Sequence, residues 1–585
     1  MINPAEATGK TKIVKYPFSG EGQARLKANS NGHGEDWPVV YVLSGTKEAY
    51  VGETSSASQR IGNHLDNPVR LKTLDSAYIF FNDYFNKSAI LDIENMLIEH
   101  MHADGKFVLQ NLNEGQSKMH NYYQRAFYKD VFNDIWSQML SKRIGLANHT
   151  ALAIENSDIF KFSPYKSLTD EQYQTEQVLL SYIANSVSSG NKRTLLVHGG
   201  AGTGKSVLAI SLLKYLADVL NGNVDYQDLE DLPDDIDFQG SINKTLISCK
   251  DRLQRIAFVV PVPAFRETVK RVFSKVKSLK TIDVLSPSDL AHSQPYDLVV
   301  VDEAHRLKRR QKLTNYRAFD KCSADVGLSS ASTELDWVER QTKGVVVLFY
   351  DPLQTLRISD VMRRDFEALE EPGGTNVVSL FNQMRLLAGK NYIDYWESVL
   401  SNRPNPLLKP DFKKTGYDFR IYDNCAQMIL DVKAKSSECG GLCRTVAGYA
   451  FPWRRKMRDK SNQKFDRDYD FEIQGQKYDW NFSRTDWATN PKADDQIGCI
   501  YTCQGYDLNV AGVILGPDIT FDPIQKRIVV KPEAFLDKNS KDKNDLAKTS
   551  ENIINAYLVL LTRGIRGTFV YAEDENLRKY LISLF

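Results

Sequence analysis

The sequence predicts an α/β protein in which a small mixed α/β domain precedes two lobes built on parallel sheets. Its 585 residues exceed the ~250–300 at which a single core stops growing, so several domains are expected. In the C-terminal two thirds, apolar strand patterns alternate with helical patterns, which is typical of parallel sheets with crossover helices. We predict an N-terminal extension over 1–37, the small domain over 38–125, a helical connector over 126–165, and lobes over 166–375 and 376–585.

The composition indicates ordinary globular domains, because 42% of the residues are hydrophobic and 25% are charged. No apolar run reaches the ~18–20 residues that a membrane span needs, and the first residues lack the apolar segment of a secretory signal. We therefore expect a cytoplasmic protein. The net charge of +1 excludes a uniformly basic coat, so any contact with nucleic acid has to come from local patches.

Seven cysteines do not form a disulfide framework in a chain of this length. Cys439 and Cys443, like Cys499 and Cys503, share a short spacing that leaves a zinc or iron–sulfur site open as an alternative. No histidine accompanies either pair, so we interpret these residues as ordinary thiols. The acidic stretch 228–237 and the Lys/Asp/Asn-rich stretch 537–545 are predicted to be solvated surface loops.

Strand and helix patterns define the small domain. Residues 1–36 are polar and irregular, whereas 39–44 form an apolar strand that turns at Gly45-Thr46 into a second strand around Tyr50 and Val51. A helix follows, because apolar residues recur at i, i+3, i+7 and i+11, namely Ile90, Ile93, Leu97 and Met101.

The strongest motif is Gly199-Gly-Ala-Gly-Thr-Gly-Lys-Ser206, which follows an apolar strand over 194–197 and precedes a helical pattern over 207–219. A phosphate-binding loop requires this setting. Lys205 is expected to reach the terminal phosphates of ATP, and the Ser206 hydroxyl to hold Mg²⁺. Backbone N–H groups of the turn are expected to surround the phosphates; the turn comprises Gly199, Gly200, Ala201, Gly202, Thr203 and Gly204.

Two later strands end in polar residues. The strand over 298–301 delivers Asp302, predicted to coordinate Mg²⁺ through water, and Glu303, predicted to orient or deprotonate the attacking water. Adjacent carboxylates favour hydrolysis over passive nucleotide binding. The strand over 344–350 leads to Gln354, which is placed to sense the γ-phosphate.

Further segments resemble the motifs of superfamily-one helicases, in the right order. Leu168-Thr-Asp-Glu-Gln172 resembles the glutamine motif, Gln383-Met-Arg385 the fourth motif and Asn555–Arg563 the sixth. The resemblance implies two RecA-like lobes, with Gln172 contacting adenine and with Arg385 and Arg563 reaching the γ-phosphate to stabilise transition-state charge. Arg566 is a weaker candidate for the same role.

The segment Ile497–Asp507 resembles the fifth helicase motif, which couples the nucleotide state to the bound strand, but departs from it at several positions. Together with Cys443–Trp453, it makes the chain most similar to a Schlafen-like subgroup of P-loop proteins. Strand unwinding is therefore a separate question from ATP hydrolysis.

Residues 38–120 resemble the GIY-YIG nucleases. Val40-Tyr41-Val42 and Tyr50-Val51-Gly52 match the two tyrosine elements; Arg60, His64, Glu94 and either Asn111 or Asn113 complete the set. The residue types suit metal-dependent phosphodiester cleavage. Tyr41 or Tyr50 would assist deprotonation, Glu94 would hold Mg²⁺ or Mn²⁺, and Arg60 would steady the developing charge.

Two basic segments are candidates for nucleic-acid contact. Tyr449–Arg458 interleaves aromatic and cationic residues, which suits stacking of single-stranded bases. Arg306–Lys312 is either a second contact or a solvated basic face. Neither distinguishes DNA from RNA.

We therefore predict an ATP-dependent nuclease–translocase that acts on DNA, in bacterial antiphage defence or DNA repair. The alternative is an ATP-gated, nucleic-acid-binding switch that controls the nuclease without processive unwinding, with RNA as a second substrate option. A third interpretation treats the N-terminal domain as a binding platform without catalysis; the intact Arg60 and Glu94 argue against it.

Overall fold

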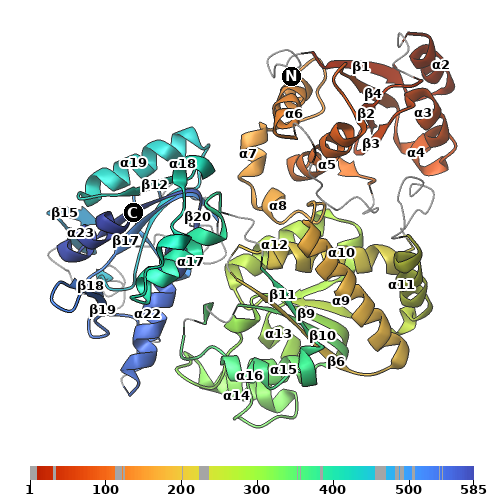
Figure 1. Cartoon of the computed structure of the whole chain (residues 1–585). Coiled ribbons are helices and arrows are strands. Elements are labelled where there is room, and N and C mark those ends of the chain that lie inside the picture. The colour runs from red at the N-terminus through yellow and green to blue at the C-terminus, as the bar shows by residue number, and fades with distance from the viewer. Residues whose placement is uncertain are drawn as a thin grey trace. The chain divides into compact units, whose positions relative to one another are not determined.

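The computed structural model of the chain describes residues 10–29, 35–111, 122, 125–200, 202–222, 236–351, 354–355, 357–381, 386–454, 469–480, 487, 490, 493–503, 507–538, 540–542 and 544–585. Figure 1 labels the helices and strands in chain order, and the chain divides into two compact units. Unit 1 comprises Met1–Ala184, Val207–Lys250 and Thr268–Thr281, and unit 2 comprises Asn185–Ser206, Asp251–Glu267 and Ile282–Phe585. The fold class is confirmed, with a small mixed sheet followed by two parallel sheets. The predicted domain boundaries stay predictions.

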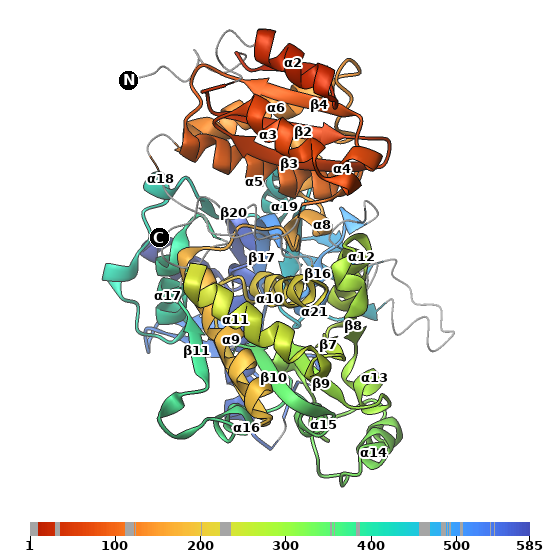
Figure 2. The same ribbon diagram turned by 90° about the vertical axis from the view of Figure 1, so that its right-hand side faces the viewer.

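The N-terminal sheet has the strand order β1-β4-β2-β3-β5. The strands are β1 (Lys12–Pro17), β2 (Val39–Ser44), β3 (Glu48–Thr54), β4 (Ser76–Phe81) and β5 (Val108–Leu109). The predicted hairpin is confirmed, since β2 and β3 pair antiparallel and place Tyr41 opposite Gly52. Figure 2 shows β2, β3 and β4 side by side. Only the pairing of β3 with β5 is parallel in this sheet.

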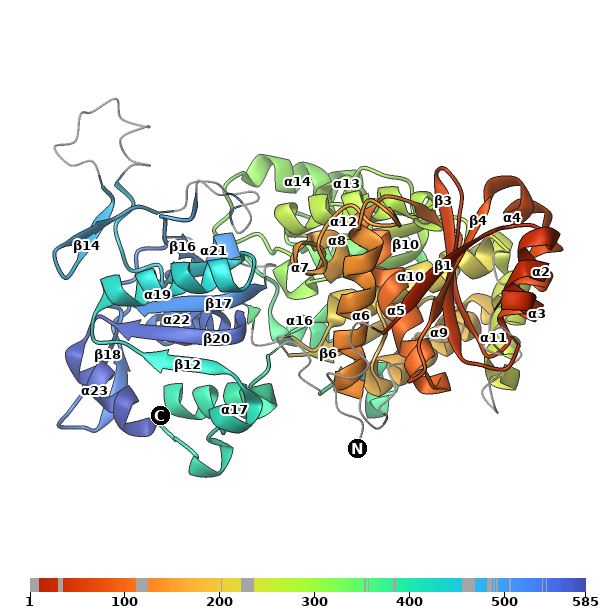
Figure 3. The same ribbon diagram turned by 90° about the horizontal axis from the view of Figure 1, so that it is seen from above.

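Helices cover both faces of this sheet, with α5 and α6 on one side and α2 and α3 on the other (Figure 3). The helices are α2 (Gly20–Asn29), α3 (Ala57–Leu65), α4 (Pro68–Thr73), α5 (Lys87–Asp104), α6 (Arg125–Leu140), α7 (Ala151–Glu155) and α8 (Asp158–Lys161). The predicted apolar face of α5 is confirmed, because Ile90, Ile93, Leu97 and Met101 are all buried. Alternation along β2 divides the side chains, so that Val40 and Val42 pack with α5 while Tyr41 and Leu43 pack with α3.

Two predictions for the ends of this domain need revision. The irregular N-terminus is wrong, because 12–17 form β1 and 20–29 form α2. Only Tyr16 of β1 is buried, and the strand owes its conformation to antiparallel pairing with β4. The connector over 126–165 is helical as predicted, and it also packs, since Phe132, Trp136 and Met139 of α6 belong to the same apolar core as β2 and α5.

The second sheet is parallel throughout and has the order β11-β6-β10-β9-β7-β8. Its strands are β6 (Arg193–Gly199), β7 (Ile256–Val259), β8 (Asp283–Leu285), β9 (Tyr296–Val301), β10 (Thr342–Tyr350) and β11 (Val377–Leu380). The helices of this stretch are α9 (Asp170–Ser189), α10 (Lys205–Leu220), α11 (Ile236–Ser248), α12 (Pro263–Lys275), α13 (Pro287–Ala291), α14 (Tyr316–Asp325), α15 (Glu334–Arg340) and α16 (Arg363–Glu367). Because neighbouring parallel strands end at one edge, the residues that follow β6, β9 and β10 meet there.

The third sheet is also parallel, with the order β12-β20-β17-β13-β16. Its strands are β12 (Asp418–Ile421), β13 (Cys443–Ala447), β16 (Gly498–Cys499), β17 (Leu508–Leu515) and β20 (Gly564–Ala572). Two hairpins accompany it, β14 (Phe471–Ile473) with β15 (Gln476–Tyr478), and β18 (Ile519–Asp522) with β19 (Arg527–Val530). The helices are α17 (Gly389–Leu400), α18 (Phe412–Thr415), α19 (Cys425–Glu438), α21 (Ile500–Cys503), α22 (Leu546–Leu561) and α23 (Glu575–Leu584).

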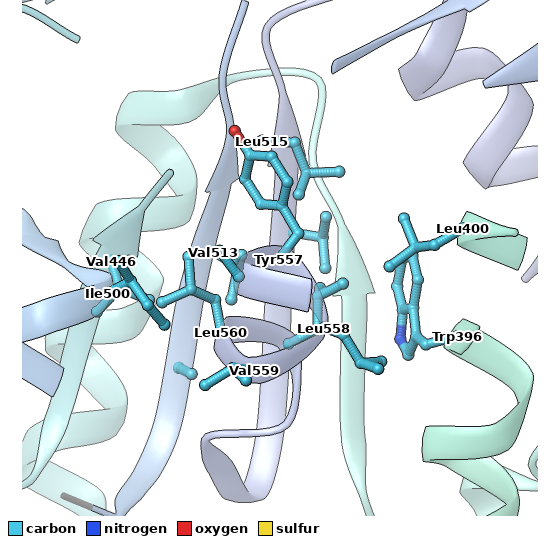
Figure 4. Packing of buried hydrophobic residues seen from close by; sticks show 14 of the residues in the cluster. Trp396, Leu400, Val446, Ile500, Val513, Leu515, Tyr557, Leu558, Val559 and Leu560 are labelled. Carbon is cyan, nitrogen blue, oxygen red and sulfur yellow. The ribbon is translucent and has the colours of Figure 1, made fainter. Parts of the chain in front are cut away.

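Both faces of the third sheet are buried. On β17, Val513 and Leu515 pack with α22, whereas Ile514 between them packs with α19. Figure 4 shows Val513 and Leu515 next to Tyr557 and Leu560 of α22, and Trp396 of α17 on the far side of that helix. This packing fixes α22, and with it the residues that directly follow the helix.

The prediction of a solvated loop over 537–545 holds only in part, because Lys538, Asn544 and Asp545 are exposed whereas two other residues are not. Asp537 and Ser540 are buried, and both hydrogen-bond the Tyr501 hydroxyl. Burial of these polar groups is tolerated because each has a partner. Residues 228–235 of the acidic stretch lie outside the described residues.

All seven cysteines are free thiols, and within the described ranges no three His, Cys, Asp or Glu side chains form a group that could hold a metal ion. In the same ranges, no helix has the length and apolar character required to cross a membrane.

Glu176 of α9 provides a test of the buried polar contacts in unit 1. Burial raises its pKa to about 7, although the Ser211 hydroxyl and Lys214 oppose the shift. A raised pKa means that the folded state keeps a proton that the unfolded state loses, so this contribution to stability is present below pH 4.5 and disappears as pH rises through about 7.

We therefore expect Glu176→Gln to gain about 2 kcal/mol of unfolding free energy, relative to the wild-type chain, between pH 5 and pH 8. Thermal unfolding at both pH values measures this change. Glu21→Gln, at an exposed carboxylate of α2, is the control and should show no such pH dependence. If the stability difference between Glu176→Gln and the wild-type chain is the same at pH 5 and pH 8, Glu176 is already ionised at pH 5.

Candidate active sites

The phosphate-binding loop joins β6 to α10, as predicted. Gly202 and Gly204 both have φ of 78°, a left-handed conformation that glycine adopts without strain. The Lys205 ammonium donates hydrogen bonds to the carbonyl oxygens of Gly199 (2.6 Å) and Gly200 (2.9 Å) and lies 3.9 Å from Asp351. Its charge is thus held over the loop. Ala201 lies outside the described residues.

Asp302, at the end of β9, is fully buried. Its Oδ1 accepts a hydrogen bond from the Glu303 backbone N–H (2.9 Å), and within the described part of the chain its Oδ2 has no hydrogen-bond partner. Burial and the neighbouring Glu303 raise the pKa of Asp302 to about 6, against the effect of Ser206 and Lys205. An unsatisfied buried carboxylate oxygen beside a serine hydroxyl fits Mg²⁺, which prefers oxygen ligands. Bound by Asp302 and Ser206, this ion would neutralise phosphate charge.

Glu303 occupies a strained backbone position with φ of 52°. Its Oε2 lies 3.0 Å from Nε2 of His305, whose Nδ1 accepts a hydrogen bond from the Asp351 backbone N–H (3.2 Å). Burial would raise the pKa of Glu303, but His305, Lys205 and Arg563 outweigh burial and hold that pKa well below its ordinary value. The carboxylate is therefore ionised at neutral pH and can accept a hydrogen bond from a water molecule.

Gln354 is buried next to the loop, and its side-chain Nε2 donates to Asp351 Oδ2 (2.7 Å). A cavity of about 340 Å³ opens at this point. Gly199, Gly200, Thr203, Asp351 and Gln354 line one part of it, and α17 and α22 line another. Its size and its position at the loop suit part of a nucleotide.

Arg563, directly after α22, is buried and acts on Glu303, whose pKa it lowers. Among the described residues its Nε has no hydrogen-bond partner. The structure thus brings one of the two predicted arginines within electrostatic reach of Glu303, the predicted catalytic carboxylate. Gln383, Arg385 and Gln504 lie outside the described residues, and Arg566 is exposed.

Gln172 belongs to unit 1 and is described by itself. It is buried at the start of α9, where its Oε1 accepts a hydrogen bond from the Thr169 backbone N–H (3.1 Å). Its proposed contact with adenine stays a prediction.

A second polar cluster lies on the face of the N-terminal sheet that α3 covers. The Tyr41 hydroxyl oxygen is 2.7 Å from His64 Nε2, and the Tyr41 and Tyr50 ring centroids are 6.3 Å apart. Arg60 hydrogen-bonds Tyr41, and Glu94 is close enough to raise the pKa of Tyr41. The structure thus brings five of the predicted nuclease residues together.

Asn111 holds the backbone of β3 next to this cluster. Its Oδ1 accepts from the Val51 N–H (2.9 Å), and its Nδ2 donates to the Val51 carbonyl oxygen (2.8 Å). Glycine at 52 is required, because a Cβ there would lie 2.2 Å from the Tyr41 hydroxyl oxygen. These contacts fix the position of β3 against β2, and therefore of Tyr50 near Tyr41. Asn113 lies outside the described residues.

Burial dominates the acid–base properties of this cluster. It raises the pKa of Tyr41 well above the ordinary value, against the effect of Arg60, so the hydroxyl keeps its proton at neutral pH. Burial, followed by Arg70 and Arg60, lowers the pKa of His64 to about 2, which leaves the imidazole neutral. In this state Tyr41 is a hydrogen-bond donor rather than a base.

Sequence reasoning missed Arg70. The guanidinium Nη1 lies 2.5 Å from His64 Nδ1, and its Cζ lies 4.1 Å from the Tyr50 ring centroid. Arg70 sits on the six-residue helix α4, whose sequence has no feature that distinguishes it from an ordinary surface segment.

Two arginines of the first basic segment form ion pairs within the protein. Arg306 pairs with Asp360 (2.9 Å), and Arg310 pairs with Asp320 (2.6 Å). In the second segment, Phe451 is buried, and Arg455 to Arg458 lie outside the described residues. For Arg306–Lys312 this favours a structural role over contact with nucleic acid.

A phosphate-binding loop, an ionised Glu303 and an arginine from the following parallel sheet together define a helicase-like ATPase. The family model of Schlafen group 3, DNA/RNA helicase domain, matches residues 192–574. The chain therefore belongs to this family.

Relatives and solved structures cover much of the chain at low identity. Uncharacterized protein YPL245W of Saccharomyces cerevisiae is 26% identical over 447 residues, which are 71% of this chain and 90% of the yeast protein. The Pif1 helicase from Bacteroides in complex with ADP-AlF3 and ssDNA is 10% identical, with 67% of this chain and 91% of that chain covered and a TM-score of 0.26. Arterivirus nonstructural protein 10 (helicase) with DNA is also 10% identical, with 67% and 63% covered and a TM-score of 0.23.

Proposed function

We propose that the protein is an ATP-dependent nuclease–translocase that acts on DNA, with a metal-dependent nuclease site in its N-terminal domain. The observation that carries the nuclease assignment is the convergence of Tyr41, Arg60, His64 and Glu94 on one cluster. Membership of a DNA/RNA helicase domain family supports nucleic acid as the substrate of the ATPase.

Each residue of the cluster has its own role in the proposed nuclease reaction. Arg60 stabilises the negative charge that develops on the phosphate, and the Tyr41 hydroxyl donates to the phosphate or orients the attacking water. Glu94 would hold a divalent cation, Mg²⁺ or Mn²⁺, which would polarise the phosphate when bound. Asn111 keeps β3 and therefore Tyr50 in place.

The test uses purified full-length protein with plasmid and single-stranded DNA, Mg²⁺ or Mn²⁺, and with or without ATP. Glu94→Gln should lower cleavage by ~10²-fold, in the range of losses seen for groups that stabilise transition-state charge. Lys205→Ala should abolish ATP hydrolysis and any response of cleavage to ATP, while cleavage without ATP persists. Glu21→Gln, at an exposed site on α2, is the matched control.

The outcomes separate the parts of the proposal. If Glu94→Gln cleaves DNA at the wild-type rate, the cleavage does not come from the proposed site but from elsewhere in the preparation. ATP hydrolysis without cleavage of DNA would contradict the DNA nuclease, and the same assay with RNA would then test the other substrate. If the wild-type chain cleaves DNA at the same rate with and without ATP, the two sites work independently.

A second candidate function is the ATP-gated switch without processive unwinding. The engagement of Arg306 and Arg310 in ion pairs favours it, because a motor that tracks a strand needs cations available to phosphates. A strand-displacement assay decides between the two: a translocating helicase releases the displaced strand, whereas the switch hydrolyses ATP without releasing it. Antiphage defence and DNA repair stay predictions about the cellular setting.

A further inference from the structure

His64 lies between two partners in the nuclease-like cluster. Its Nε2 is 2.7 Å from the Tyr41 hydroxyl oxygen, and its Nδ1 is 2.5 Å from Arg70 Nη1. The imidazole is 1% exposed, so water does not compete for either ring nitrogen. Both nitrogens therefore have their hydrogen-bonding roles set by the protein.

The chemistry of the partners fixes the direction of both hydrogen bonds. A guanidinium group carries only donors and keeps its proton in proteins, so His64 Nδ1 must accept from Arg70. A neutral imidazole carries a single proton, which then resides on Nε2 and is donated to the Tyr41 oxygen. The low pKa of His64 agrees, because a protonated imidazole could not accept from Arg70.

Arg70 is itself held in place. Its guanidinium Cζ lies 4.1 Å from the Tyr50 ring centroid, within the range of a cation–π contact. The Tyr50 ring also meets the His64 ring edge-on at 4.9 Å. At the N-terminus of α4, the Asn67 side chain accepts from the Arg70 backbone N–H (3.2 Å). Tyr50 and the helix cap thus orient the guanidinium toward His64.

We propose that Arg70 is a positioning residue of the nuclease, which fixes the His64 tautomer so that Tyr41 accepts from His64 and presents its own hydroxyl proton to the substrate. This inference rests on the proposed nuclease function. Without Arg70, the imidazole can carry its proton on Nδ1 instead. Nε2 would then accept the Tyr41 proton and withdraw it from the phosphate.

Substitutions at Arg70 test the hydrogen-bond direction separately from the charge. Arg70→Met removes the donor and should lower cleavage by ~10–10²-fold, the loss expected of a misdirected proton donor. Arg70→Gln is neutral but still donates, and it should keep cleavage within about threefold of the wild-type rate if only the tautomer matters. Lys72→Met, at an exposed cation two residues along α4, removes the same charge and should change little.

Each result decides the question. If Arg70→Gln loses as much activity as Arg70→Met while Lys72→Met does not, Arg70 acts through its charge on the phosphate, and the positioning role is overturned. If all Arg70 variants cut as the wild-type chain does, Arg70 has no part in the reaction. Circular dichroism on each variant verifies that the domain is folded.

A second measurement does not require nuclease activity. Nitrogen-15 labelling of the histidines, with the His64 resonances assigned by their loss in His64→Gln, reports which ring nitrogen is protonated. We expect a protonated Nε2 and a bare Nδ1 in the wild-type chain, and a population of the opposite tautomer in Arg70→Met. A protonated Nδ1 in the wild-type chain would overturn the inference. The expected tautomer in a protein that cuts no nucleic acid would instead count against the proposed function alone.

Discussion

Replacement of Arg563 by alanine is expected to lower the rate of ATP hydrolysis by ~10³-fold or more, within the range measured for arginines that stabilise phosphoryl transfer. The side chain is buried, and within the described part of the chain its Nε has no hydrogen-bond partner. A buried cation without a full set of partners is costly, so its retention beside Glu303 indicates a function that requires a nearby anion. We expect the terminal phosphate of ATP to be that anion.

The measurement is steady-state ATP hydrolysis, together with binding of a fluorescent ATP analogue. Binding should be retained, because the arginine acts mainly on charge that develops in the transition state. Arg563→Lys should recover little activity, since an ammonium lacks the planar fork of the guanidinium. Arg566→Ala, at an exposed arginine three residues later, is the control. Turnover within about tenfold of the wild-type rate in Arg563→Ala would contradict the role, because an arginine finger is worth far more.

The stability of the same variant carries information. Burial of a charge without a structural partner is unfavourable, so its removal need not destabilise the chain, whereas removal of one partner of a buried ion pair costs about 3–5 kcal/mol. We therefore expect Arg563→Ala to unfold at a temperature no lower than that of the wild-type chain. A large drop in this temperature, together with loss of activity, would identify Arg563 as a structural residue.

The ATP site could be predicted from sequence because its signals are local. A glycine-rich turn between an apolar strand and a helix defines the loop, and Asp302 and Glu303 directly follow a second apolar strand. Parallel strands then bring these residues to one edge without any long-range information. The same reasoning found the hairpin of the N-terminal domain and the helix that carries Glu94.

The features that escaped prediction depend on partners far away in the sequence. β1 has one buried residue and becomes a strand by pairing with β4, about sixty residues later. Arg306 belongs to a basic segment whose composition suggests a binding surface, but it pairs with Asp360. Asp537 lies in a polar stretch and is buried because Tyr501 provides a partner. None of these contacts leaves a periodic or compositional signal.

Arg70 belongs to the same class. Its contact with His64 requires the short helix α4 to fold back against α3. Neither the spacing from Arg60 nor the residue type predicts this contact. A resemblance to a nuclease family supplied Tyr41, Arg60, His64 and Glu94 as a set. The hydrogen bonds that orient this set could be assigned only from the distances between side chains.

Glu303→Gln is expected to lower ATP hydrolysis by ~10²–10⁴-fold, the contribution of a positioned general base, while ATP binding persists. The carboxamide keeps the shape of the side chain but does not take a proton. His305, Lys205 and Arg563 lower the pKa of the carboxylate, so it is ionised at neutral pH and available to orient the attacking water. Glu367→Gln, at an exposed carboxylate of α16, is the control. A rate within about threefold of wild type in Glu303→Gln would exclude the general-base role.

The backbone at Glu303 allows a second test of the same assignment. Its φ of 52° is strained for a glutamate but not for glycine, and a strained residue persists where function requires it. We expect Glu303→Gly to lose hydrolysis to the same extent as Glu303→Gln while unfolding at an equal or higher temperature, because the change relieves roughly 1 kcal/mol of strain. Calorimetry and the hydrolysis assay together separate the two effects. If Glu303→Gly unfolds at a lower temperature, the contact between Glu303 and His305 contributes more to folding than the strain removes, and the carboxylate is then retained for stability as well as for catalysis.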